Sequence, residues 1–92
     1  PKIESIEIYD EDYIYEGDYV DIDVTTNNSV YEVVIMDNDN YELTSTTSYD
    51  EDDSSYIWEL SFYADYDGSY YVYAYDADGN EVYKRFTINF IE

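Results

Sequence analysis

Tyrosine is the most abundant side chain in this sequence that could bind a ligand. Fifteen of the 92 residues are Tyr, and three of them, Tyr71, Tyr73 and Tyr75, are spaced two apart. In a strand this spacing places all three on one side, and Tyr83 joins them if the next segment forms a hairpin. Such a stripe of phenol rings could stack on sugar rings or on a protein partner. The alternative is structural, because Tyr favours strands and stabilises sheets without a ligand.

Acidic turns form a second candidate site. Asp37 and Asp39 occupy one turn, and Asp76, Asp78 and Asn80 occupy another. Carboxylate and amide oxygens gathered from several loops are the ligands that Ca²⁺ prefers. Neither turn completes the twelve-residue calcium-binding loop, and Asp and Asn also form turns through hydrogen bonds to their own backbone. The sequence therefore predicts no required cofactor, with Ca²⁺ as the one metal ion that these turns could bind.

The missing residue types exclude several kinds of chemistry. Without Cys or His there is no thiol nucleophile, no Ser-His dyad, no disulfide and no site for a soft metal. The 24 carboxylates make close acidic pairs inevitable, but glycoside hydrolysis also needs a long cleft, for which a 92-residue chain has little room. We therefore predict no catalytic residue and expect the chain not to be an enzyme.

The formal net charge of −21 restricts the possible partners. Binding to nucleic acid or to anionic lipid depends on cations, and Lys2, Lys84 and Arg85 are the only ones in the sequence. No apolar run is long enough to span a bilayer, so no membrane insertion is expected. The acidity could reflect high salt, an acidic niche, or a bacterial surface where charge keeps chains apart. We favour the third explanation, because the three cations also leave trypsin few sites to cleave.

Apolar and polar residues alternate with a period of two, which predicts strands rather than helices. Seven segments follow this pattern, at residues 3–9, 19–26, 30–36, 41–47, around 58–62, 69–75 and 81–91. Residues 30–36 are apolar on both faces, which predicts a central strand. Residues 49–53 are expected to form an acidic loop. Seven short strands with frequent turns predict an all-β, antiparallel β-sandwich that spans residues 1–92 as one domain.

The second half of the chain resembles the last three strands of bacterial immunoglobulin-like domains, through Trp58-x-Leu60-x-Phe62 and Gly68-x-Tyr70-x-Val72-x-Ala74-x-Asp76-x-Asp78-Gly79-Asn80. The earlier strands of that family are similar to Glu16-Gly17-Asp18-x-Val20-x-Ile22-x-Val24 and to Val30-x-x-Val33-x-Ile35-x-Asp37-x-Asp39. Residues 68–80 are also similar to small triple-tyrosine β-domains of bacterial surface and sensor proteins. The family resemblance implies a seven-stranded immunoglobulin-like β-sandwich from a secreted or wall-anchored protein. Greater acidity and more Tyr set this chain apart from the family.

The immunoglobulin-like topology implied by the resemblance divides most of the acidic turns between two poles. One pole would carry Asp50, Glu51, Asp52, Asp53, Asp76, Asp78 and Asn80, and the other would carry Asp10, Glu11, Asp12, Asp37, Asp39, Asp65 and Asp67. If modules stack end to end, acidic pole meets acidic pole, and the like charges repel unless cations intervene. The functional interpretation of these turns is therefore a Ca²⁺ ion held between neighbouring modules.

Together these features predict a non-catalytic spacer or adhesin-arm module of a larger bacterial protein, located outside the cell or on its surface. Its expected partners are neighbouring modules of the same chain. The alternative is a carbohydrate- or protein-binding module that uses Tyr71, Tyr73, Tyr75 and Tyr83, with a glycan or a host or surface protein as partner.

Overall fold

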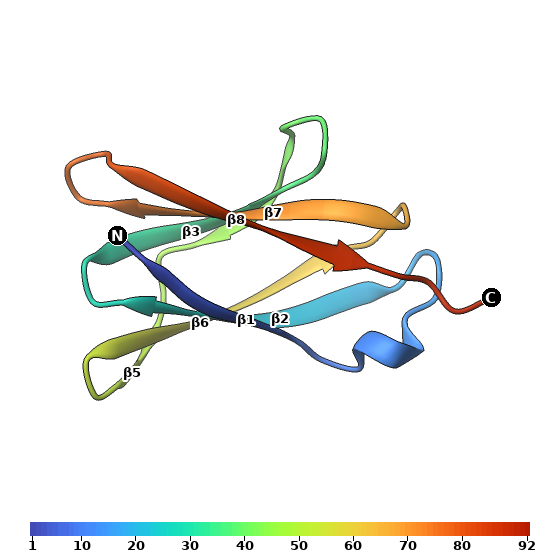
Figure 1. Cartoon of the computed structure of the whole chain (residues 1–92), viewed down its shortest axis with the longest axis horizontal. Coiled ribbons are helices and arrows are strands. Elements are labelled where there is room, and N and C mark those ends of the chain that lie inside the picture. Colours follow the sequence, from blue (N-terminus) through green and yellow to red (C-terminus); the bar gives the residue numbers. More distant parts are fainter.

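The computed structural model describes residues 1–92 and contains two antiparallel sheets of four strands each (Figure 1). The first sheet has the order β1-β2-β6-β5 and the second β4-β3-β7-β8. The strands are β1 (Ile3–Ile8), β2 (Tyr19–Asn27), β3 (Val30–Met36), β4 (Glu42–Thr46), β5 (Asp50–Asp52), β6 (Ser55–Tyr63), β7 (Gly68–Asp76) and β8 (Glu81–Ile88). A short 3₁₀ turn, η1 (Glu11–Tyr13), lies between β1 and β2. No helix has the length and apolarity needed to cross a membrane.

The prediction of seven strands is wrong, because the structure has eight. The additional strand is β5, which lies where the sequence predicted an acidic loop. Its three exposed acidic residues carry no apolar alternation, so no periodic signal marks them as a strand. They form one through backbone pairing with β6, with Asp50 opposite Ile57 and Asp52 opposite Ser55. Charged side chains on such an edge strand also discourage pairing with other chains.

The last strand ends at Ile88 rather than at residue 91. The following residues leave the sheet and are held by contacts with two loops. The backbone N–H of Phe90 donates to a carboxylate oxygen of Asp67 at 2.9 Å, and that of Ile91 donates to the carbonyl of Ile14 at 2.8 Å. Phe90 still packs against the core, although its backbone no longer pairs in the sheet. The apolar alternation therefore extends beyond the end of the strand.

The two sheets share one core of 16 buried residues, in a sandwich-like arrangement. The inward residues of β2, β6 and β7 that the alternation predicted are all buried: Val20, Ile22, Val24, Trp58, Leu60, Phe62, Tyr70, Val72 and Ala74. Strand β3 lies between β4 and β7, which confirms the central position predicted for residues 30–36.

Two hairpins of the second sheet share one turn geometry. In the β7–β8 turn, the N–H of Asp76 donates to the carbonyl of Asn80 at 3.0 Å, and Gly79 has a φ of 84°. The β3–β4 turn repeats this pattern between Asp37 and Tyr41, at 2.9 Å, with Asn40 at a φ of 63°. Both turns place Gly or Asn at the left-handed position, the residue types that adopt it most readily.

Tyr70 fixes the connection between β6 and β7 to the core. Its side chain has no exposed surface, and its hydroxyl donates to the carbonyl of Tyr66 at 2.8 Å. The two rings stack with centroids 4.4 Å apart, and the hydroxyl of Tyr66 donates in turn to the carbonyl of Ser69 at 2.6 Å. A loop that contains few apolar residues is thereby held at a defined position over one end of the core.

Replacing Tyr70 by Phe is expected to lower the free energy of unfolding by roughly 1–2 kcal/mol. The ring is kept, but the carbonyl of Tyr66 loses the hydroxyl that satisfies it. Urea denaturation of the Tyr70→Phe variant measures the loss. Tyr41→Phe is the matched control, because Tyr41 is 70% exposed and its change should stay within about 0.5 kcal/mol. Equal losses in the two variants would contradict this role for Tyr70.

The same variant should change the response to alkaline pH. Burial raises the pKa of Tyr70 from its ordinary 10.0 to about 12. Between these two pH values the folded protein keeps the Tyr70 proton, whereas the unfolded chain releases it. Rising pH therefore favours unfolding, and the free energy of unfolding falls across this interval. The free energy of unfolding, measured between pH 10 and pH 12, should depend less on pH in Tyr70→Phe than in the parent protein.

Candidate functional site

The strand register brings the four predicted tyrosines together on the outer surface of the second sheet. Tyr73 on β7 lies directly opposite Tyr83 on β8, and their ring centroids are 5.4 Å apart. The ring of Tyr71 is 6.2 Å from that of Tyr83, and the ring of Tyr75 is 6.4 Å from that of Tyr73. These four rings form one continuous surface, which we call the tyrosine face.

The tyrosine face covers an apolar strand. Val34 and Met36 of β3 lie opposite Tyr73 and Tyr71. Val34 is only 4% exposed, although it does not belong to the 16-residue core between the sheets. Tyr83 remains 63% exposed at the same time. The tyrosines therefore bury part of β3 and also present accessible aromatic surface, so the structural and the binding interpretations apply to the same residues.

The two ends of the tyrosine face differ in charge. Tyr75 lies between Glu32 on β3 and Glu81 on β8, in one row across three strands. Burial raises the pKa of Tyr75, and the charge of Glu81, its hydrogen bond, Tyr73 and Glu32 raise it further. At the other end, Arg85 lies opposite Tyr71. Glu42 on β4 lies opposite Met36 in that same row. The face therefore has two carboxylates at the Tyr75 end, and one cation and one carboxylate at the Tyr71 end.

The carboxylate of Asp76 holds its own turn. One of its oxygens accepts the backbone N–H groups of Asp78 and Asn80, both at 2.9 Å, and the other accepts the side-chain amide of Asn80 at 3.0 Å. These hydrogen bonds, that of the Asn80 side chain above all, lower the pKa of Asp76. The turn thus uses the oxygens that would have to coordinate a cation.

The β3–β4 turn uses Asp37 in the same way. Its carboxylate accepts the backbone N–H groups of Asp39 at 2.8 Å and of Tyr41 at 2.9 Å. This turn lies beside the β6–β7 connection, where the N–H of Asn38 donates to the hydroxyl of Tyr66, whereas the β7–β8 turn lies at the end nearer the N-terminus (Figure 1). Within one chain no group of three or more acidic side chains is placed to hold a metal ion. A Ca²⁺ ion between modules stays a prediction.

An acidic row crosses the outer surface of the first sheet. Glu7, Asp23 and Glu59 lie directly opposite one another on β1, β2 and β6. A hollow of about 490 Å³ lies over this row, and it is lined by Tyr9, Asp21, Ile22, Asp23, Glu59, Leu60 and Ser61. A hydrogen bond to Asp23 is the largest cause that raises the pKa of Tyr9 to about 12. Like charges that face each other across strands destabilise a sheet.

The sequence did not predict this row, because the alternation shows which face a residue takes and not which residues on neighbouring strands become neighbours. The outward positions of Asp23 and Glu59 follow from the period of two. Their adjacency depends on the register between two strands whose facing residues are 36 positions apart in the chain, which no local pattern specifies.

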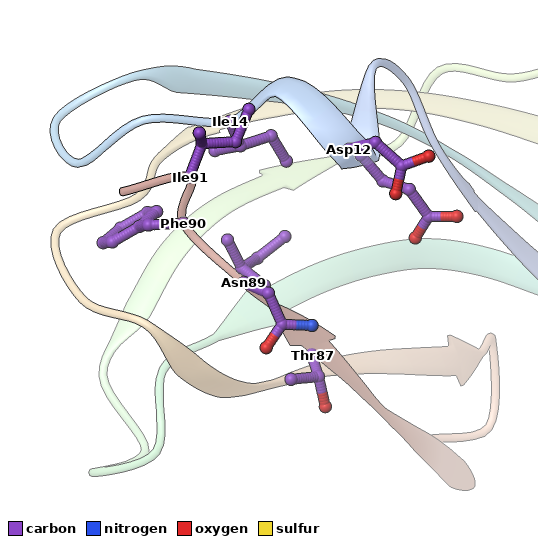
Figure 2. A pocket seen from close by; sticks show the side chains of 8 residues that line it. Asp12, Ile14, Thr87, Asn89, Phe90 and Ile91 are labelled. Atoms are coloured by element: carbon purple, nitrogen blue, oxygen red, sulfur yellow. The ribbon is translucent and has the colours of Figure 1, made fainter.

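A second hollow, of about 250 Å³, lies between η1 and the segment that follows β8 (Figure 2). Ile14, Ile88, Phe90 and Ile91 supply apolar surface, and Glu11, Asp12, Thr87 and Asn89 supply polar groups. Figure 2 shows the carboxylate of Asp12 on one side and Asn89 on the other. The hollow lies beside the last residues of the chain, so a segment attached there would pass close to it.

No family model matches the chain, and no curated protein matches it. The assignment of a role therefore rests on the tyrosine face, on the topology of the sheets and on the positions of the two termini.

Proposed function

We propose that the chain is an immunoglobulin-like β-sandwich module that serves as a non-catalytic spacer or adhesin arm in a bacterial extracellular or cell-surface protein. One observation carries the proposal: the N- and C-termini lie at opposite ends of the longest dimension (Figure 1). That dimension measures 41 Å, against 27 and 17 Å for the other two. Modules joined through such ends form an extended row, which is the arrangement that a spacer requires.

The topology supports the immunoglobulin-like part of the proposal. The orders β1-β2-β6-β5 and β4-β3-β7-β8 correspond to sheets A-B-E-D and C′-C-F-G of such sandwiches. Tyr70, near the start of β7, bonds to a backbone carbonyl four residues upstream, as does the tyrosine corner of many immunoglobulin-like domains. One feature differs from antibody domains, whose buried Trp lies on strand C. Here Trp58 lies on β6, and no Cys is present.

The direction of the terminal strands supports a role under tension. Strands β1 and β8 run along the long axis, β1 from the N-terminal end and β8 towards the C-terminal end (Figure 1). A force between the termini would therefore pull each strand along its neighbour, β1 along β2 and β8 along β7. The hydrogen bonds of each pair would then share the load instead of opening one after another.

The length of tandem arrays tests the spacer role. Small-angle X-ray scattering on proteins of two, three and four joined copies should show a maximum dimension that grows by close to 41 Å with each copy. Arrays can be stiff because the copies repel one another or because the connection between copies is rigid. Scattering in about 0.15 M and about 1 M salt distinguishes the two causes, since only the repulsion is screened at high salt.

Matched arrays in which flexible Gly/Ser linkers of about ten residues separate the copies are the control. Their length should grow more slowly with copy number than that of directly joined copies. An increment below 27 Å for the direct arrays would overturn the proposal, because the copies would then fold back beside one another.

A second candidate function is recognition of a glycan or a protein by the tyrosine face. The observation that favours it is the convergence of Tyr71, Tyr73, Tyr75 and Tyr83 on one outer surface, with Tyr83 well exposed. Aromatic rings with polar tips are typical of surfaces that contact sugars and proteins. A spacer that also carries such a face would act as an adhesin arm.

A further inference from the structure

We propose that the tyrosine face binds a cationic peptide segment, with an Arg or Lys side chain seated at Tyr75 between Glu32 and Glu81. This inference rests on the second candidate function, whose partner it specifies, and it does not depend on the spacer role. It follows from the distribution of charge along the face.

The acidic end combines the two groups that recognise an organic cation. The faces of aromatic rings attract ammonium and guanidinium groups, and the attraction strengthens as water is excluded. The ring of Tyr75 is half-buried and lies nearly parallel to that of Tyr73, at an angle of 17°. Glu32 and Glu81 flank Tyr75 on the neighbouring strands and offer carboxylates on both sides. A guanidinium at this position would contact a ring and pair with a carboxylate.

No cationic side chain lies in the row of Glu32, Tyr75 and Glu81, and the one cation near this end is the N-terminal ammonium, which acts on Asp76. The three cationic side chains of the chain are Lys2, Lys84 and Arg85. Arg85 lies on the tyrosine face but opposite Tyr71, and it is four residues along β8 from Glu81, which corresponds to about 13 Å in a strand. The two carboxylates beside Tyr75 therefore have no cationic side chain next to them in the sheet, and Glu81 accepts a hydrogen bond from the Tyr75 hydroxyl.

Charge also selects the class of partner. A surface with a net charge of −21 repels acidic proteins and attracts basic ones over long range. An extended peptide fits the surface better than a compact ligand, because three of the four rings follow β7 for about 13 Å, with Tyr83 beside them on β8, and no deep cavity lies there. Arg85 at the far end of the face repels a second positive group. The preferred segment therefore has a neutral or acidic residue about 13 Å beyond its Arg or Lys.

Binding of a labelled peptide, Gly-Ser-Arg-Ser-Arg-Ser-Gly, followed by fluorescence anisotropy, tests the inference. The double variant Glu32→Gln/Glu81→Gln should bind about fivefold more weakly, as expected for the loss of two exposed ion pairs. Tyr75→Leu should bind roughly 2- to 30-fold more weakly, because it keeps apolar surface and removes the ring.

The matched control is Glu7→Gln/Glu59→Gln on the opposite sheet. Both double variants change the net charge by the same amount, from −21 to −21 + 2 = −19. The control should weaken binding less than about twofold, through long-range attraction alone. Equal weakening by the two double variants would overturn the inference, since binding would then follow net charge and not the tyrosine face.

Glycan binding separates failure of this inference from failure of the function on which it rests. A second peptide with Gln in place of both Arg residues is compared with the Arg peptide, and a glycan array is tested with the parent protein and with Tyr73→Ala. If Tyr73→Ala abolishes glycan signals while the Arg peptide binds no better than the Gln peptide, the cationic partner is wrong and the tyrosine face remains a binding surface. If neither ligand binds, both are wrong. Thermal unfolding of each variant shows whether the fold is intact, and heteronuclear NMR shifts at Tyr75 and Glu81 on adding the peptide would support the proposed position.

Discussion

Raising the NaCl concentration from about 10 mM to about 1 M is expected to increase the free energy of unfolding by on the order of 5 kcal/mol. Folding confines 24 carboxylates within a radius of gyration of 12.9 Å, against roughly 30 Å for an unfolded chain of this length. The charges repel one another more strongly in the folded state. Salt shortens the screening length from about 30 to about 3 Å, which removes most of that difference.

Close contacts between like charges add to this long-range repulsion. The row of Glu7, Asp23 and Glu59 contains two pairs that face each other across strands. Each such pair costs roughly 0.2–1 kcal/mol when it is not screened. Because a small domain is stable by only about 5–15 kcal/mol, the protein is expected to be close to its unfolding transition at the lowest salt.

Urea denaturation at a series of NaCl concentrations measures this effect, and the same series near pH 4 is the control. The isoelectric point calculated from the sequence is about 4.1, so the net charge there is small and the dependence on salt should largely vanish. Stability that is independent of NaCl at pH 7 would contradict the electrostatic explanation.

The same experiment tests the predicted calcium site. CaCl₂ at matched ionic strength should act like NaCl on a single copy, because the carboxylates of Asp37 and Asp76 already accept hydrogen bonds from their own turns. A larger effect of CaCl₂ on joined copies than on a single copy would support an ion between modules. The comparison of one copy with two therefore decides where such an ion would bind.

The fold could be predicted as far as local alternation reveals it. Val20, Ile22 and Val24 are inward because a strand repeats every two residues, and a buried face requires apolar side chains. The strand β5 could not be predicted in this way, because acidic side chains on an exposed edge need no alternation and its conformation depends on backbone bonds with β6.

The tyrosine face could be predicted, and the charges at its ends could not. Tyr71, Tyr73 and Tyr75 lie on a single strand, so their spacing alone places them together. Glu32 comes to Tyr75 from a strand 43 positions earlier, through a register that shifts between Val30 and Glu32. Such an irregularity changes which residues become neighbours, and no local sequence pattern reveals it.

Trp58→Ala is expected to lower the free energy of unfolding by about 3–5 kcal/mol, the largest effect of any single substitution proposed for this chain. Trp58 has no exposed surface, and Tyr49 and Tyr56 pack against it with ring centroids 5.1 and 6.2 Å away. Removing the indole leaves a cavity that these rings and both sheets cannot close completely. Denaturation in urea at about 1 M NaCl measures the loss under conditions where the parent protein is most stable.

A double-mutant cycle separates packing of Trp58 from its hydrogen bond. The indole N–H donates to the hydroxyl of Thr26 at 2.8 Å, and Thr26 is the one buried polar residue of the chain. Thr26→Val keeps the shape but leaves the N–H without an acceptor, at a cost of roughly 1–3 kcal/mol. In a Trp58→Phe background the same change should cost less, because no buried donor remains. Equal costs in both backgrounds would show that the indole hydrogen bond contributes nothing, and that Thr26 acts through packing or through its own hydrogen bond to the carbonyl of Asn27 at 2.9 Å.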